Sequence, residues 1–201
     1  LPDGSVRNYE SPVTGYQIAE SIGPRLLKDA ICVEIDNKFQ DLSFEISENI
    51  KIRIVTIKDL DALHILRHSS AHILAQAVLN LYPNAQFGVG PSIENGFYYD
   101  FLFETPIKEN ELEEIEKEMK RIAKSSQSFI KSEITKKDAI KIFRNQKLKL
   151  ELIESAESDE GVGEEIVSTY ANDEFIDLCM GPHVPSTSVL KHFKLTKVSG
   201  A

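Results

Sequence analysis

The stretch His68-Ser69-Ser70-Ala71-His72 lies in the part of the sequence that decides the fold. No Asp, Glu, Lys or Arg occurs between Arg67 and Glu94, and apolar residues recur there at steps of three and four. This periodicity predicts a helix over residues 61–82, which Pro83 ends. Because the face opposite the apolar stripe carries no charge, we expect this helix to be buried on most of its sides.

Three histidines share one face of the predicted helix. His64, His68 and His72 are spaced four residues apart, so their side chains stack over successive turns. We expect His68 and His72 to point into an interior space or a lined cleft. Two imidazoles one turn apart can bind a metal or share proton-transfer work, and the spacing leaves both options open.

The composition is typical of a globular protein of one or two domains. The chain has 201 residues, of which 41% are hydrophobic and 27% charged. It has no apolar run long enough to cross a membrane and no signal-peptide pattern, so we expect a cytoplasmic protein without a membrane partner. Its two cysteines, Cys32 and Cys179, are expected to stay unpaired, and one thiol could be functional.

The charge is unevenly distributed along the chain. The net charge of −9 argues against broad, non-specific nucleic-acid binding. Residues 131–149 are nevertheless rich in lysine and arginine, whereas residues 150–180 contain neither and are acidic. A basic patch beside an acidic lobe could steer one end of a polyanion, but a solvated amphipathic helix explains the basic residues equally well.

The first sixty residues predict a small α+β module. A helix from Thr14 through Leu27 lies among short strands, an order that fits a β-grasp (ubiquitin-like) domain. Turns are expected at Asp3-Gly4 and Asp36-Asn37. Because the module contains no histidine, we interpret it as a binding or spacer module. Its expected strands are residues 5–9, 32–35, 38–40, 42–46 and 51–55.

The rest of the chain predicts a larger α+β domain with an antiparallel sheet and the buried helix. Residues 109–125 predict a charged surface helix, and Thr135-Lys136-Lys137-Asp138 approximates a capping box that opens a helix through Phe143. Gly161-Val162-Gly163 is expected to be a loop. The expected strands are residues 87–91 and 96–101, joined by a turn at Glu94-Asn95, then 129–134, 148–153, 166–170, 175–179 and 192–198.

A second reactive pair stands near the end of the chain, where a predicted strand runs into a Gly-Pro turn. Cys179 and His183 are four residues apart. Set beside His68 and His72, they complete four ligands of the atom types that bind zinc. The same set could carry out general acid–base hydrolysis without a metal.

Lys149 is a further candidate. It falls in Lys147-Leu148-Lys149-Leu150-Glu151, whose alternation predicts a strand. Facing inward, Lys149 could bind a phosphate or a carbonyl oxygen, whereas the spacing alone favours an exposed lysine.

Taken in order along the chain, these motifs resemble the N-terminal part of the bacterial threonyl-tRNA synthetase family. The matching segments are Leu1-Pro2-Asp3-Gly4-Ser5, His68-Ser69-Ser70-Ala71-His72, Gly90-Pro91, Asn95-Gly96-Phe97-Tyr98-Tyr99-Asp100 and Cys179-Met180-Gly181-Pro182-His183-Val184-Pro185. The resemblance covers essentially the whole chain. It implies a TGS domain over residues 1–60 and, over residues 61–201, an editing domain related to that of alanyl-tRNA synthetase.

The implied activity is hydrolysis of the ester in Ser-tRNA(Thr), formed when serine is mischarged. Serine lacks one methyl of threonine, and a group of that size is worth only about 1–3 kcal/mol in a binding pocket. A second site that removes the smaller product is therefore needed. The residues carried over by position are His68, His72, Lys149, Cys179 and His183 as catalytic groups, and Asp177, Tyr99 and Gly90 as substrate-binding groups.

The resemblance also suggests individual roles. His68, alone or with Lys149, would activate or orient the water, while His72 and His183 would hold the terminal adenosine and the carbonyl. Asp177 would engage the seryl amine or hydroxyl, and Tyr99 and the Gly90 backbone would line the pocket. Cys179 as a covalent nucleophile is an alternative to a positioned water. The match does not extend to His64.

The expected partner is tRNA(Thr), bound through its 3′-terminal seryl-adenosine. The aminoacylation core is absent, so ATP and its zinc are expected only in a full-length homodimeric ligase, and this fragment is expected to be monomeric and to need no cofactor. If zinc is bound here, His68, His72, Cys179 and His183 would hold it. The alternative function is a zinc-stabilised tRNA-binding or regulatory module without hydrolytic activity.

Overall fold

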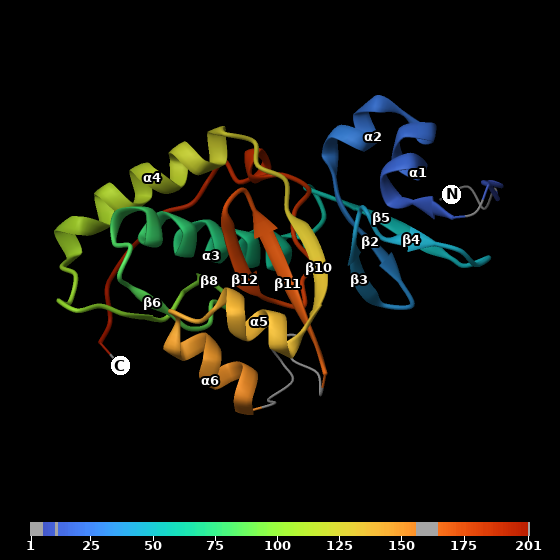
Figure 1. Ribbon diagram of the computed structural model, residues 1–201. Coiled ribbons are helices and arrows are strands. Elements are labelled where there is room, and N and C mark those ends of the chain that lie inside the picture. The colour runs from blue at the N-terminus through green and yellow to red at the C-terminus, as the bar shows by residue number, and fades with distance from the viewer. Residues whose placement is uncertain (1–5, 11, 156–164, 201) are drawn as a thin grey trace. The chain divides into compact units, whose positions relative to one another are not determined.

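The computed structural model describes residues 6–10, 12–155 and 165–200, and the chain divides into two compact units, residues 1–63 and 64–201 (Figure 1). Helices are combined with strands whose pairings are all antiparallel among the described residues, which confirms the α+β class. No helix in this part of the chain is both long enough and apolar enough to span a membrane. The predicted turn at Asp3-Gly4 and loop at residues 161–163 lie outside the described residues.

The first unit combines a three-stranded sheet with two short helices, α1 (Gly15–Ile22) and α2 (Pro24–Asp29). In the sheet, β2 (Ala30–Ile35) lies between β3 (Lys38–Asp41) and β5 (Ile52–Thr56), and β1 (Val13–Thr14) pairs separately with β4 (Glu45–Ile46). The core of the unit contains Ala19, Ala30, Val33 and Leu42. Whether this unit is a β-grasp domain stays a prediction.

Local sequence signals explain most of the first unit. Thr14 begins α1 with a capping box shared with Gln17, and a two-residue turn with positive φ at Asp36 (48°) and Asn37 (62°) joins β2 to β3. The single helix predicted through Leu27 was wrong, because Gly23 and Pro24 separate α1 from α2.

Two strands predicted in this unit were also wrong in part. Residues 6–9 form no strand, and the segment is instead tied down by side chains, with the Arg7 guanidinium donating to the Ser21 carbonyl at 3.0 Å. The strand predicted over residues 42–46 is shortened to Glu45–Ile46, because a turn precedes it.

The second unit is built around α3 (Ala62–Leu81), as its periodicity predicted. Every residue from Ser69 through Val78 is buried, which confirms that the helix is covered on most sides. Asn80 of α3 donates to Glu118 of α4 (Leu112–Lys124), and Asn172 donates to Gln76 of α3.

A three-stranded sheet supplies the second half of the site. Its order is β10 (Ile130–Thr135), β11 (Ile166–Asn172) and β12 (Phe175–Leu178), close to the strands predicted there. Tyr170 is paired with Asp177 in the register of β11 and β12. Cys179 follows directly after β12, so the sheet delivers this thiol to the neighbourhood of α3.

Two nested hairpins follow α3. The inner one pairs β7 (Ser92–Ile93) with β8 (Gly96–Phe97) around the predicted turn at residues 94–95, and the outer one pairs β6 (Gln86–Phe87) with β9 (Phe101–Leu102). The two longer strands predicted here are thus four strands of two residues each.

The remaining helices include one correction. A short 3-10 turn, η1 (Glu109–Glu111), precedes α4, and Thr135 caps α5 (Lys136–Ile142) through the N–H of Asp138, as predicted. Residues 148–153, predicted as a strand, lie in helix α6 (Lys147–Ser155). Lys, Leu and Glu favour helices over strands, and this propensity outweighs the short apparent alternation.

The strand predicted over residues 192–198 was also wrong, because this segment has no regular secondary structure. The N–H of Leu195 donates to the Glu116 carboxylate of α4 at 3.1 Å instead of to a neighbouring strand. A buried side chain on α4 thus takes the place of a strand partner.

Candidate functional site

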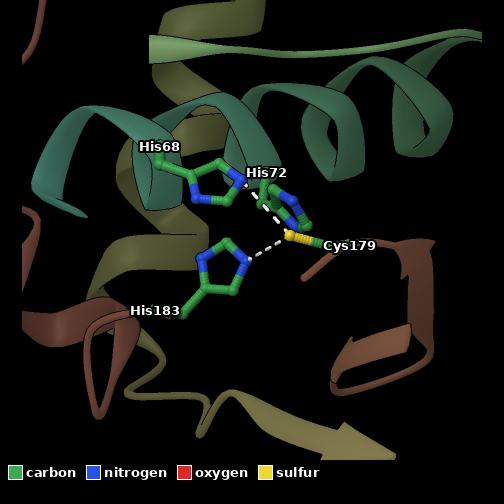
Figure 2. A group of neighbouring side chains, drawn as sticks. All are labelled: His68, His72, Cys179 and His183. Carbon is green, nitrogen blue, oxygen red and sulfur yellow. Dashed lines mark hydrogen bonds between the residues drawn. The ribbon is translucent and has the colours of Figure 1, made fainter. Parts of the chain in front are cut away.

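Four side chains from two distant parts of the sequence converge at one point of the second unit. His68 and His72 come from α3, and Cys179 and His183 come from the segment that follows β12 (Figure 2). One ligand atom from each residue lies within 4.8 Å of those of the other three. The Cys179 Sγ lies 3.3 Å from Nε2 of His68 and 3.3 Å from Nε2 of His183. The structure therefore brings together the two pairs that the sequence singled out.

A cavity of ≈ 180 Å³ adjoins this cluster. Its walls come from α3, the segment before β7, and the end of β12 with the turn that follows. The lining residues are His64, His68, His72, Gly90, Pro91, Ser92, Asp177, Leu178, Cys179, Met180 and Gly181.

Beside the cavity, Lys149 and Asp177 form a buried ion pair. Their Nζ and Oδ1 atoms are 2.5 Å apart, and both side chains are at most 2% exposed. Lys149 also donates to the Gly88 carbonyl and, at 3.2 Å, to the Tyr99 hydroxyl, while the Tyr99 hydroxyl donates to Oδ2 of Asp177. The ammonium thus donates two hydrogen bonds and lies in ion-pair contact with a third oxygen atom, Oδ1 of Asp177.

This network revises the position of Lys149. The lysine is fully buried and lies on a helix, whereas its spacing had favoured an exposed residue on a strand. It is not among the residues that line the cavity, although its partner Asp177 is. Lys149 is therefore placed to hold the Asp177 carboxylate in position.

Tyr99 and Gly90 are also close neighbours. A Cβ added at Gly90 would collide with the Tyr99 ring, so glycine lets the aromatic ring pack directly against the backbone. Gly90 lines the cavity, while Tyr99 is 8% exposed and supports the cavity wall from behind.

The three central histidines are held neutral. Burial, followed by the effect of neighbouring His72 and His64, lowers the pKa of His68 to about 3. Burial and the nearby Lys149 ammonium likewise lower the pKa of His72 to about 3. Oδ2 of Asp177 lies 3.7 Å from Nε2 of His72, but the carboxylate is already paired with the Lys149 ammonium. Its charge is therefore balanced without protonation of His72. Burial also lowers the pKa of His183 well below its usual value.

His183 is packed tightly on several sides. Its ring stacks on Phe129 with 4.7 Å between centroids and lies T-shaped to the Tyr170 ring with 4.5 Å between centroids. Gly181 has a φ of +75°, and a Cβ there would collide with the Tyr170 hydroxyl. These contacts fix the turn that carries His183, and neither aromatic residue was singled out from the sequence.

Two residues on the cavity rim are not among the predicted site residues. They are His64, which the sequence placed on the face of His68 but the resemblance did not cover, and Ser92. His64 lines the cavity, and its Nδ1 lies 2.6 Å from the Ser92 hydroxyl. The four-residue spacing of His64 and His68 was the available signal. Ser92 carries no comparable signal, because a lone serine beside a turn is ordinary.

The donor set of the cluster fits zinc. Three imidazoles and one thiol are common zinc ligands, and zinc bond lengths imply separations of about 3.3–3.6 Å between neighbouring ligand atoms. The two Sγ–Nε2 distances, both 3.3 Å, are slightly shorter than the roughly 3.5 Å expected for a sulfur and a nitrogen on one zinc ion, and the four ligand atoms lie within 4.8 Å of one another. His68, His72, Cys179 and His183 are the residues that would hold the metal, which would act as a Lewis acid or stabilise the fold.

An antiparallel α+β unit with a histidine–cysteine cluster beside a cavity suits a hydrolytic or metal-binding domain. Residues 167–201 match a protein family described as "Threonyl and Alanyl tRNA synthetase second additional domain". The matched segment includes Asp177, Cys179 and His183, but not α3.

The whole chain is similar to threonine–tRNA ligases. It is 48% identical over 203 residues to that of Francisella philomiragia, 47% over 203 residues to that of Ralstonia nicotianae, and 48% over 204 residues to that of Burkholderia multivorans. Each alignment covers 100% of this chain and 31% of the relative. The chain is thus homologous over its full length to part of these ligases.

Proposed function

We propose that this chain is the editing region of a threonine–tRNA ligase and that it hydrolyses Ser-tRNA(Thr). The observation that carries the proposal is the convergence of His68, His72, Cys179 and His183 within 4.8 Å beside a cavity, in a chain 48% identical to a threonine–tRNA ligase. In this proposal the second unit is the editing domain and the first is the TGS domain. The whole ligase would attach threonine to tRNA(Thr) with ATP.

The reaction needs a water, an acceptor for its proton and a cavity that fits serine. Water oxygen attacks the ester carbonyl carbon, the bond to the ribose oxygen breaks, and that oxygen takes a proton, which releases serine and free tRNA. A base with a pKa of about 3 takes up a proton weakly, so His68 acts mainly by orienting the water through a neutral ring nitrogen.

Other residues would hold the substrate. Asp177 lines the cavity and carries a carboxylate that could meet the seryl amine, and Lys149 holds it in place. Nδ1 of His72 is buried and has no hydrogen-bond partner among the described residues, so it is suited to a substrate group. The threonine methyl would be excluded by a cavity too tight for it, or would displace the water.

The test is a deacylation assay with Ser-tRNA(Thr) and Thr-tRNA(Thr) side by side, in the full ligase that carries this chain. We expect release of serine and sparing of threonine. His68→Asn and His72→Asn should each slow serine release by at least about 100-fold, the scale of the loss when the water or the substrate is no longer held in position. His192→Asn is the matched control, since His192 is exposed and does not line the cavity. Equal rates of serine release in the wild type and in the His68→Asn, His72→Asn and His192→Asn variants would refute the assignment of His68 and His72 to the site.

A second candidate function is supported by the zinc-compatible donor set. In it, the four residues bind zinc and stabilise a tRNA-binding module without hydrolysis. Metal analysis separates the two functions. Stoichiometric zinc, unfolding on chelation and no release of serine would favour the second.

A further inference from the structure

The wall of the cavity that α3 supplies runs from the buried interior outward to the rim. His72 is 2% exposed, His68 is half-buried and His64 is exposed, and all three line the cavity. Residues four apart on a helix are neighbours one turn apart, with about 5–6 Å between their Cβ atoms. His64 is therefore the outermost of three histidines that mark increasing depth in the cavity.

The segment at the end of β12 supplies a second wall with the same gradient. Asp177 is 1% exposed, Cys179 is 3% exposed and Met180 is 51% exposed, and all three line the cavity. The two walls meet where the Cys179 Sγ lies 3.3 Å from Nε2 of His68. His64 lies one turn outward from this contact and Met180 follows it directly, so these two side chains, the rim pair, flank it on the solvent side.

His64 is held in place although it is exposed. Its Nδ1 lies 2.6 Å from the hydroxyl of Ser92 in β7, which also lines the cavity. One turn further along α3, the Arg67 guanidinium donates to the carbonyl of Ile93 at 3.4 Å. The start of α3 is thus tied to β7 at two points. A ring that is already fixed loses little freedom when a ligand packs on it.

Met180 offers a complementary surface. Its side chain is unbranched and its sulfur is polarisable, so it adapts to a flat ring and makes favourable contacts with aromatic systems. The rim pair therefore combines a fixed imidazole ring with an adaptable thioether. Both suit the face of a planar, aromatic ligand, and stacking of this kind is how proteins hold single unpaired bases.

We propose that His64 and Met180 bind the base of the terminal nucleotide at the cavity rim. This inference rests on the proposed function, in which the seryl group lies near Asp177 and the ester near His68. The ester and the base are attached to the same ribose. A substrate whose seryl group is at the buried end of the cavity and whose ester is at His68 therefore directs its base outward, to the rim pair.

The experiment measures binding of two non-hydrolysable compounds to the full chain by isothermal titration calorimetry. One is 3′-deoxy-3′-(L-serylamino)adenosine, and the other is the same compound with hydrogen in place of adenine. For the wild type, we expect loss of the base to weaken binding by at least about tenfold. His64→Ala and Met180→Ala should each weaken binding of the adenine compound by at least about fivefold, the lower end for one lost stacking contact. Neither variant should change binding of the compound without a base.

Two further variants test the kind of contact. His64→Phe keeps a flat ring and should keep the affinity for the adenine compound within about threefold of the wild type. Leu102→Ala is the matched control, because Leu102 is 58% exposed and does not line the cavity. It should bind both compounds as the wild type does. A His64→Phe protein as weak as His64→Ala would overturn stacking as the role of His64.

Equal affinity of the wild type for the two compounds, or no binding of the adenine compound, would overturn the proposal without any variant. If His64→Ala and Met180→Ala bind like the wild type while the full ligase releases serine from Ser-tRNA(Thr), the rim pair fails and the proposed function stands. If both variants lose affinity only for the adenine compound but the ligase releases no serine, the rim pair stands and the proposed function fails.

Discussion

The ammonium of Lys149 lies 2.5 Å from the carboxylate of Asp177, and both groups are buried beside the cavity. The ring of Phe87 lies 4.8 Å from the same ammonium and closes the site on another side. Each charge thus depends on the other, since water cannot replace a lost partner.

Lys149→Met is expected to destabilise the chain by about 3–5 kcal/mol, because it leaves the Asp177 carboxylate buried without its cation. Urea unfolding measures the loss. Lys147→Met, an exposed position on the same helix, should change stability by less than about 0.5 kcal/mol. The double variant Lys149→Met/Asp177→Leu should recover part of the loss, and a double variant no more stable than Lys149→Met would argue against the ion pair as the cause.

Acid should destabilise the chain through its neutral histidines. The pKa of His68 and of His72 is about 3 in the fold and about 6.5 in the unfolded chain, so the unfolded state binds more protons between these values. Stability is therefore greatest above pH 6.5 and falls as the pH drops toward 3, by up to about 1.4 kcal/mol per pH unit for each histidine.

The measurement is urea unfolding at several pH values from 6.5 to 5, above the range in which ordinary carboxylates titrate. The free energy of unfolding should change less steeply with pH in His72→Gln than in the wild type. In the exposed His192→Gln variant it should change as steeply as in the wild type. An equal pH dependence of the free energy of unfolding in His72→Gln and the wild type would contradict the neutral, buried state of His72.

Gly90→Ala should destabilise the cavity wall. The new methyl would collide with the Tyr99 ring, whose hydroxyl is held by Asp177 and cannot withdraw freely. Overpacking of this kind costs about 1–3 kcal/mol. Gly96→Ala is the control, since no atom lies within 4 Å of an added Cβ there. Equal thermal stability of the two variants would show that the ring can move aside.

Glu116→Ala should loosen the segment after His192. The carboxylate is 7% exposed and accepts from the Leu195 N–H and, at 3.3 Å, from the Lys194 ammonium. Loss of one hydrogen bond worth about 1 kcal/mol corresponds to about fivefold faster amide exchange at Leu195. Hydrogen exchange followed by NMR measures this, with the exposed Glu113→Ala as the control. Unchanged exchange would mean that other contacts hold the segment.

Local pattern was sufficient for much of the fold. The uncharged, periodic stretch that contains His68 and His72 predicted a buried helix, and α3 is buried from Ser69 through Val78. Turn and capping residues placed the Asp36-Asn37 hairpin and the start of α5. Lys149 was misplaced because five alternating residues resemble a strand, although their helix propensity pointed the other way.

The sequence by itself determined which side chains carry the chemistry: two imidazoles one turn apart on a charge-poor helix, and a thiol and an imidazole around a Gly-Pro turn. Only the tertiary structure decided that these pairs meet, that Lys149 is buried against Asp177, and that Met180 lines the same cavity as His64. The physical reason is that periodicity reports which face of an element is covered. It does not report what covers that face, because contacts between residues on different elements depend on how those elements pack.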